Sequence, residues 1–123
     1  MFKKYEKKGL TIFSEGDKGE SMYVVLEGVI VITKLTFKHD KEKIVTLAKL
    51  KKGSVFGEIS LLSKQSRTTG AITDSSLVIV MVIDKKTLES FDLGIQKLFH
   101  TQMISTLIRR LDDMNEKYRD VID

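Results

Sequence analysis

The spacing of apolar residues changes once along this chain, near Ile83, and that change limits the possible fold. Before it, the apolar runs are short, rich in β-branched residues and bounded by Gly, Asp, Lys or Ser, which is typical of β-strands. The clearest runs are Tyr23–Leu26, Val29–Ile32, Ile44–Leu47 and Leu77–Ile83. After it, apolar residues recur every three or four positions, which indicates helices. We therefore expect a mainly β fold with C-terminal helices.

The turns between these runs depend on glycine, because the chain contains no proline. Glycine permits tight turns that other residues resist. Four glycines fall between the predicted strands, namely Gly16, Gly19, Gly28 and Gly53. The polar run Lys38–Lys43 predicts the exposed tip of a β-hairpin.

Two helices are predicted after the strands. Asp84 is suited to be the N-cap of a short helix that ends near Phe91. Gly94 is expected to break the chain before a long helix from about Ile95 to Arg119.

The apolar face of this long helix shifts along its length. At 100° per residue, the early apolar residues lie on one face of the predicted helix; they are Ile95, Leu98, Phe99 and Met103. An a/d heptad pattern follows and faces elsewhere; its members are Ile104, Leu107, Leu111, Met114, Tyr118 and Val121. We expect the early half to pack on the strands, and the heptad half to meet a second copy in a homodimer or to lie over a pocket. The alternative is that both halves cover the core.

Composition argues against several classes of protein. The 123 residues include no Cys, so disulfides and thiolate chemistry are excluded, and the composition fits the cytoplasmic location that we expect. The longest apolar run, Leu77–Ile83, is far shorter than the ~20 residues of a membrane helix, and no signal-peptide core follows the basic start. The only histidines are His39 and His100, so we expect no bound metal. The sequence has no phosphate loop, dinucleotide fingerprint or nucleophile elbow, so we expect no cofactor and no enzymatic activity.

The net charge of +4 is too small to name a partner. Lysines form two small clusters, within Lys3–Lys8 and Lys49–Lys52. Solvated turns account for both clusters, so a nucleic-acid patch is the weaker interpretation and nucleic acid is not an expected partner.

One segment, Gly53–Leu62, predicts a binding site. Gly57 permits a close backbone approach, and a helical turn from Glu58 would present free amides to an anion. Arg67 follows nine residues later and offers a planar fork suited to phosphate. Glu58 would repel a phosphate but could accept a hydrogen bond from a sugar hydroxyl beside it, so the set describes a nucleotide pocket. The alternative is a Glu58–Arg67 ion pair that closes a loop.

These segments resemble the cyclic nucleotide-binding domain family. The front half, Gly9–Gly28, is similar to the family's pattern of a Gly-Asp turn, a second Gly three residues later, an aromatic-led strand and a closing Gly. The back half, Phe56–Leu62 with Arg67–Thr69, is similar to its phosphate-binding cassette. The resemblance implies an eight-stranded antiparallel β-roll of jelly-roll type that contains a short cassette helix. A single domain would then fill 1–123, with the roll over about 5–83 and helices over about 84–120.

The resemblance also implies roles for individual residues. Glu58 would hold the ribose 2′-hydroxyl, Arg67 would pair with the cyclic phosphate, and Thr68 would place a hydroxyl near phosphate or base. Backbone amides would come from Gly57, Ile59 and Ser60, and candidates for the apolar wall around the base are Val45, Leu47 and Phe56.

Two positions depart from the family's usual pattern. Ser66 stands where proline is usual before the cassette arginine, which leaves that loop less preset. Thr69 stands where a small alanine is common, and its bulk could narrow the pocket.

The resulting hypothesis is a sensor that binds cAMP or cGMP and repositions its last helix. We expect a chain of 123 residues to have no room for an attached output domain, and we therefore expect another molecule to act on the signal. The alternative hypothesis is a degenerate family member that serves as a dimerisation or protein-interaction domain without binding nucleotide.

Overall fold

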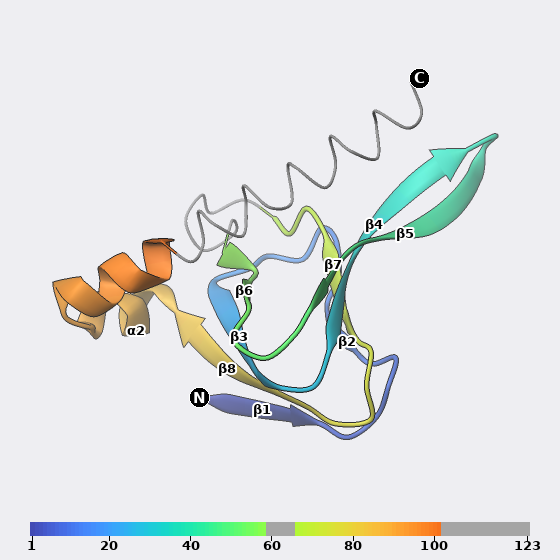
Figure 1. Cartoon of the computed structure of the whole chain (residues 1–123). Coiled ribbons are helices and arrows are strands. Elements are labelled where there is room, and N and C mark those ends of the chain that lie inside the picture. Colours follow the sequence, from blue (N-terminus) through green and yellow to red (C-terminus); the bar gives the residue numbers. More distant parts are fainter. Residues whose placement is uncertain (59–65, 102–123) are drawn as a thin grey trace, which may run out of the picture.

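The computed structural model describes residues 1–58 and 66–101. Within these residues, eight strands form two four-stranded antiparallel sheets that face each other (Figure 1). The first sheet has the order β1 (Phe2–Tyr5), β8 (Val78–Asp84), β3 (Ser21–Glu27) and β6 (Val55–Phe56). The second has the order β2 (Thr11–Phe13), β7 (Gly70–Thr73), β4 (Ile30–Lys38) and β5 (Lys41–Leu50). The expected mainly β, eight-stranded antiparallel roll is thus confirmed.

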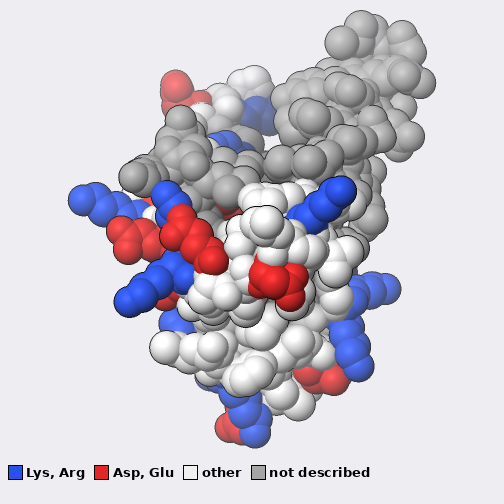
Figure 2. Space-filling view, turned by 90° about the vertical axis from the view of Figure 1, so that its left-hand side faces the viewer, with Lys and Arg blue, Asp and Glu red and all other residues white. Residues whose placement is uncertain are grey.

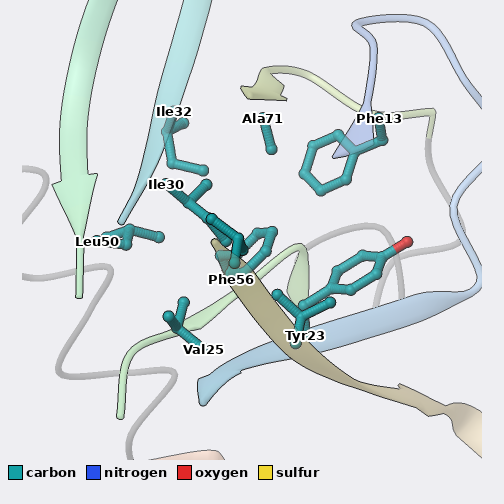
Figure 3. Packing of buried hydrophobic residues seen from close by; sticks show 10 residues of the cluster. Phe13, Tyr23, Val25, Ile30, Ile32, Leu50, Phe56 and Ala71 are labelled. Atoms are coloured by element: carbon teal, nitrogen blue, oxygen red, sulfur yellow. The ribbon is translucent and has the colours of Figure 1, made fainter. Parts of the chain in front are cut away.

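The main core lies between the two sheets and is centred on three aromatic rings (Figure 3). The rings of Tyr23 and Phe56 stack with their centroids 5.0 Å apart, and the ring of Phe13 lies 5.7 Å from the first and 6.0 Å from the second. Rings at these separations attract one another beyond the gain from burial alone. Aliphatic side chains from both sheets surround them, among them Val25, Ile30, Ile32, Leu50 and Ala71.

A second cluster covers the opposite face of the first sheet. Successive residues of a strand point to opposite faces, so Tyr23 and Val25 enter the main core while Met22 enters the second cluster. The other buried members of this second cluster are Val55, Ile83 and Leu88, and Phe91 and Phe99 pack against them. The helical end of the chain is thereby joined to the roll.

The helix α2 (Lys85–Ser90) follows β8 directly. The carboxylate of Asp84 accepts a hydrogen bond of 2.7 Å from the amide of Thr87, and the helix ends at its C-cap Phe91. The prediction of an Asp84-capped helix ending near Phe91 is confirmed.

The next helix spans 93–101 of the described residues, so the predicted break at Gly94 is wrong. Asp92 caps this helix by accepting a hydrogen bond of 2.9 Å from the amide of Ile95, which leaves Gly94 inside the first turn. Phe99 stacks on Phe91, with ring centroids 5.7 Å apart. Ile95 and Leu98 stay exposed, so only part of the expected early face meets the roll.

The heptad residues predicted for a dimer lie outside the described residues, together with Met103. These heptad positions are Ile104, Leu107, Leu111, Met114, Tyr118 and Val121. Among the described residues, no helix has both the length and the apolar character needed to cross a membrane.

The hairpin of β4 and β5 projects beyond the rest of the roll, away from α2 (Figure 1). The predicted tip Lys38–Lys43 is too long, because Lys38 already pairs with Lys41. The turn consists of His39 and Asp40, with φ angles of 53° and 62°. Two successive residues with positive φ form a tight turn that lets both strands continue to its edge.

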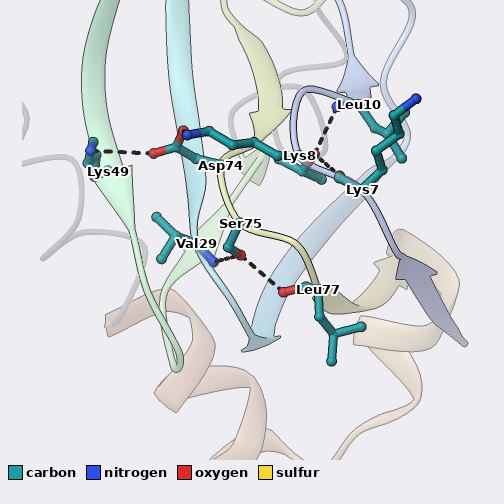
Figure 4. A network of polar contacts seen from close by, with 9 residues as sticks. Lys7, Lys8, Leu10, Val29, Lys49, Asp74, Ser75 and Leu77 are labelled. Carbon is teal, nitrogen blue, oxygen red and sulfur yellow. Dashed lines mark hydrogen bonds and ion pairs between the residues drawn. The ribbon is translucent and has the colours of Figure 1, made fainter.

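One end of the roll is closed by polar contacts between loops (Figure 4). The hydroxyl of Ser75 accepts a hydrogen bond from the amide of Val29 and donates one to the carbonyl of Leu77. Asp74 forms ion pairs with Lys8 at 3.7 Å and Lys49 at 3.4 Å.

One face of the molecule mixes both signs of charge. On the face in Figure 2, acidic and basic side chains are interspersed around a white centre of uncharged residues. The described part of this face therefore does not gather its charge into a single block of one sign.

Candidate functional site

Arg67 is the centre of the candidate site, because its cation is held inside the roll. The side chain is 5% exposed. Its Nη1 donates a hydrogen bond of 2.5 Å to the carbonyl of Gly57, and its Nη2 donates one of 2.7 Å to the carbonyl of Ser21. Its Cζ lies 4.3 Å from the centre of the Phe13 ring, within the range of a cation–π contact. A guanidinium carries five N–H donors, more than these two carbonyls take up.

The main chain around Arg67 is fixed by the turn that joins β2 to β3. The amide of Arg67 donates to the carbonyl of Asp17 at 2.7 Å, and the carbonyl of Arg67 accepts from the amide of Gly16 at 2.8 Å. A β-bridge between Lys18 and Ser66 adjoins them. The Gly-Asp turn noted in the sequence is therefore the element that positions the main chain of Arg67.

Gly19 lies against the guanidinium itself. A Cβ atom built on Gly19 would overlap Nε and Cζ of Arg67. The φ angle of Gly19 is not positive, so its backbone conformation does not require glycine. Glycine is required because the guanidinium leaves no space for a side chain.

Glu58 brings a second charge to the same place. A helix begins at Glu58, immediately after Gly57, whose φ of 78° favours glycine. The Glu58 side chain is 1% exposed. Burial lowers the pKa of Arg67, while attraction from Tyr23, Glu58 and Asp17 opposes that shift. A buried carboxylate and a buried guanidinium thus lie close enough to influence each other.

The remaining predicted site residues occupy different environments. Phe56 is fully buried in the main core, where it stacks on Tyr23. Val45 and Leu47 are half-buried on β5, and Leu47 is the extra residue of a β-bulge, between the pairs Ile32–Ala48 and Thr33–Thr46. At the other side, Thr68 is exposed and Thr69 is half-buried. Ile59 and Ser60 lie outside the described residues.

Several residues at the site were not singled out as site residues from the sequence. Ser21 contributes only its carbonyl, which no residue type signals. Phe13 and Tyr23 supply ring faces to the guanidinium, with the Tyr23 ring centre 5.6 Å from Cζ. The signal for Tyr23 was available, because it belongs to the aromatic-led strand of the front motif.

The arrangement is suited to hold an anion that also carries hydroxyl groups. The guanidinium provides paired donors for a phosphate, and the carboxylate of Glu58 provides an acceptor beside it. Among the described residues, no group of three or more His, Cys, Asp or Glu side chains is placed to hold a metal ion.

Comparison with known proteins identifies the family of the chain. The family model described as "Cyclic nucleotide-binding domain" matches residues 3–92. The human cGMP-dependent protein kinase 2 is 32% identical over 83 residues, which cover 68% of this chain and 11% of the kinase.

Two solved structures show the same fold over nearly the whole chain. The Catabolite Activator Protein of Thermus thermophilus superposes with a TM-score of 0.76 at 24% identity, over 98% of this chain and 54% of that one. The cGMP-bound form of the EAL enzyme Bd1971 superposes with a TM-score of 0.61 at 25% identity, over 99% of this chain and 31% of that one. This chain thus spans only part of the length of these relatives. It belongs to the cyclic nucleotide-binding domain family.

Proposed function

We propose that this chain binds cAMP or cGMP at Arg67 and Glu58 and acts as a non-catalytic sensor. The observation that carries the proposal is the buried Arg67 guanidinium, which lies beside Glu58 at the start of a helix. Arg67 would bind the cyclic phosphate, and Glu58 would accept a hydrogen bond from the ribose 2′-hydroxyl. The cGMP-bound relative supports this ligand class.

The neighbouring residues would complete the pocket. The amide of Gly57, with those of Ile59 and Ser60, would face phosphate and sugar, as at other helix starts that bind anions. The half-buried Val45 and Leu47 would contact the base, and Thr68 and Thr69 would adjoin it from the other side. Phe56, being fully buried, would support the pocket from beneath by stacking on Tyr23.

We further propose that binding repositions the C-terminal helix. Val55 immediately precedes the Phe56–Glu58 segment and belongs to the second cluster, against which Phe91 and Phe99 pack. Ligand contacts at Gly57 and Glu58 would shift Val55, and the cluster would pass that shift to the helical end of the chain. The ligand would favour one of two helix positions by binding one of them more tightly. Such a sensor of soluble nucleotides would act in the cytoplasm.

A thermal-shift panel tests the binding proposal directly. Purified protein is heated with cAMP, cGMP, a cyclic dinucleotide or linear 5′-AMP, and the melting temperature is recorded. Ligand at 100 times its dissociation constant stabilises the folded state by about 2.7 kcal/mol. We expect a clear rise with cAMP or cGMP and little change with 5′-AMP, which lacks the cyclic phosphate. If none of the cyclic nucleotides raises the melting temperature, the proposal is overturned in favour of an interaction domain.

A further inference from the structure

The residue after Arg67 is tied to the second sheet by a side chain outside the nucleotide site. Nζ of Lys34, on β4, donates a hydrogen bond of 2.8 Å to the carbonyl of Thr68. The same Nζ lies 3.1 Å from Oε1 of Glu15. One ammonium group therefore links β4, the turn after β2 and the chain that follows the cassette.

Glu15 is itself fixed by the edge of a strand. The last residue pair between β4 and β7 is Thr33–Gly70, so the amide of Leu35, two residues further along β4, lies past the end of β7. Oε2 of Glu15 accepts a hydrogen bond of 2.6 Å from this amide. The carboxylate thus takes the place of the missing strand, with one oxygen on Leu35 and the other on Lys34.

The charge of Glu15 suits this double role. Partial burial works against its ionisation, but the hydrogen bonds from Leu35 and Lys34 and the charge of Lys34 outweigh it, so the pKa of Glu15 lies below its usual value. The carboxylate is therefore ionised at neutral pH and attracts Lys34 throughout the physiological range.

We propose that Glu15 and Lys34 are positioning residues of the nucleotide site: Lys34, oriented by Glu15, holds the Thr68 carbonyl and so fixes the Arg67–Thr68 segment against β4. This inference rests on the proposed function, because Lys34 acts on the ligand only through Arg67 and Thr68. The turn at Gly16 and Asp17 fixes Arg67 from one side, and Lys34 fixes the next residue from the other. The pair is partly exposed, with side-chain exposures of 28% for Glu15 and 43% for Lys34. Such a pair contributes little to overall stability, so its removal should change position more than folding.

The test measures nucleotide affinity by calorimetry in three variants of the full chain. Lys34→Met removes the ammonium and should weaken binding of the tighter of cAMP and cGMP by about fivefold to tenfold. Lys34→Arg can still reach both oxygens and should stay within about twofold of wild type. Lys4→Met is the matched control, since Lys4 lies on the distant strand β1 and forms an ion pair of 3.0 Å with Glu6, just past the end of that strand, and it should bind like wild type.

A coupling measurement separates positioning from a general structural effect. Glu15→Gln should weaken binding in the wild-type background but add little in the Lys34→Met background, because Glu15 acts through Lys34. Melting temperatures should remain within about 2 °C of wild type, as expected for a partly exposed pair. Fully additive losses, or a loss of binding that follows the melting temperature, would overturn the proposal.

Hydrogen exchange tests the same linkage without any ligand. The amides of Arg67 and Gly16 are hydrogen-bonded to each other's segments, and both should exchange several-fold faster in Lys34→Met than in Lys4→Met. Unchanged exchange at both amides would overturn the inference whether or not nucleotide binds. If these amides exchange faster in Lys34→Met but the wild-type protein binds no cyclic nucleotide, the proposed function is overturned. The structural link from Lys34 to the Arg67–Thr68 segment would then still hold.

Discussion

Gly19 and Arg67 share a contact that leaves no space for a side chain on the glycine. The backbone of Gly19 lies against the guanidinium, and a Cβ atom there would overlap Nε and Cζ. The guanidinium in turn donates hydrogen bonds to the carbonyls of Gly57 and Ser21. A glycine of the front motif thus packs directly against the cation of the back motif.

A methyl group at Gly19 should therefore impair binding more than folding. In Gly19→Ala the flexible Arg67 side chain can move aside, but its guanidinium would lose its present hydrogen bonds. We expect at least tenfold weaker binding of cyclic nucleotide, which corresponds to the loss of one charge-assisted hydrogen bond. Calorimetry measures this change.

Gly9→Ala is the matched control for this substitution. Gly9 has open space around it but a φ of 85°, so alanine there should cost about 1 kcal/mol of stability through backbone strain. Its affinity for nucleotide should stay unchanged. Equal affinities for the Gly19 and Gly9 variants would contradict the role given to Gly19.

Removal of the cation should be the most damaging change to binding. Arg67 can form two charge-assisted hydrogen bonds to a phosphate, each worth about 1.5–3 kcal/mol. Arg67→Leu should weaken cyclic nucleotide binding by roughly a hundredfold or more. It should also lower the melting temperature, because the carbonyls of Gly57 and Ser21 lose their donors, while the fold survives.

Lys49→Leu provides a comparison for Arg67→Leu, since it removes a cation whose partner is Asp74 at the end of the roll. That variant should bind nucleotide like wild type. Calorimetry showing unchanged affinity in Arg67→Leu would overturn the assignment of Arg67.

Glu58 should determine the preference for an intact ribose. Glu58→Ala removes the acceptor proposed for the 2′-hydroxyl, so affinity for the ribose ligand should fall by about tenfold while affinity for its 2′-deoxy analogue changes little. The measured quantity is the ratio of the two dissociation constants. Glu58→Gln keeps the size of the side chain and an acceptor oxygen, and its ratio should lie nearer to wild type. A ratio that is the same in wild type and Glu58→Ala would refute this role.

The tip of the β4–β5 hairpin should be open to stabilisation. Asp40 has a φ of 62°, a conformation that costs most residues about 1–2 kcal/mol and glycine almost nothing. Asp40→Gly should therefore raise the free energy of unfolding by up to about 1 kcal/mol, measured by urea denaturation. Asp40→Ala keeps the strain and should not stabilise. A gain of the same size in both variants would show that charge, and not φ, is responsible.

Two carboxylates should make the fold sensitive to acid. Hydrogen bonds from Thr87 hold the pKa of Asp84 below its usual value, and the contacts of Glu15 with Leu35 and Lys34 do the same for Glu15. A depressed pKa contributes stability that is fully present above the unfolded-state pKa of about 4 and is lost as the pH falls through the folded-state value. Melting temperatures between pH 7 and pH 3 should therefore fall less steeply below pH 4 in Asp84→Asn and Glu15→Gln than in wild type. Parallel curves would contradict these assignments.

Features encoded by neighbouring residues were the ones that the sequence predicted well. The strands β3 and β8, the Asp84 cap and the helix start at Glu58 each depend on a short run of the chain. At Asp92 and Gly94 two local signals competed, and the side-chain cap prevailed because it satisfies the first amides of the helix while glycine is merely tolerated there. The strands of the hairpin are longer than expected. They extend to a two-residue turn at His39 and Asp40, whose positive φ angles could not be predicted because the turn contains no glycine.

The partners of Arg67 could not be predicted in the same way. Its hydrogen bonds go to the main-chain carbonyls of Ser21 and Gly57, and every residue carries a carbonyl. The link from Lys34 to Thr68 has the same character, because it joins positions 34 residues apart through a backbone atom. Such contacts follow from the closed roll and leave no pattern in the sequence.

The pairing of the first strand with the last also affects how the molecule is made. Phe2 pairs with Met81, and Tyr5 pairs with Val78, so within the roll β1 can pair only after β8 has been synthesised. Pairings so distant along the chain form slowly, on a scale of about milliseconds to seconds, because the intervening loop must be closed before they are gained. Arg67 meets the carbonyl of Ser21 within the same closed roll. A ribosome-bound chain therefore acquires the contact between Arg67 and Ser21 late, after nearly the whole roll has emerged.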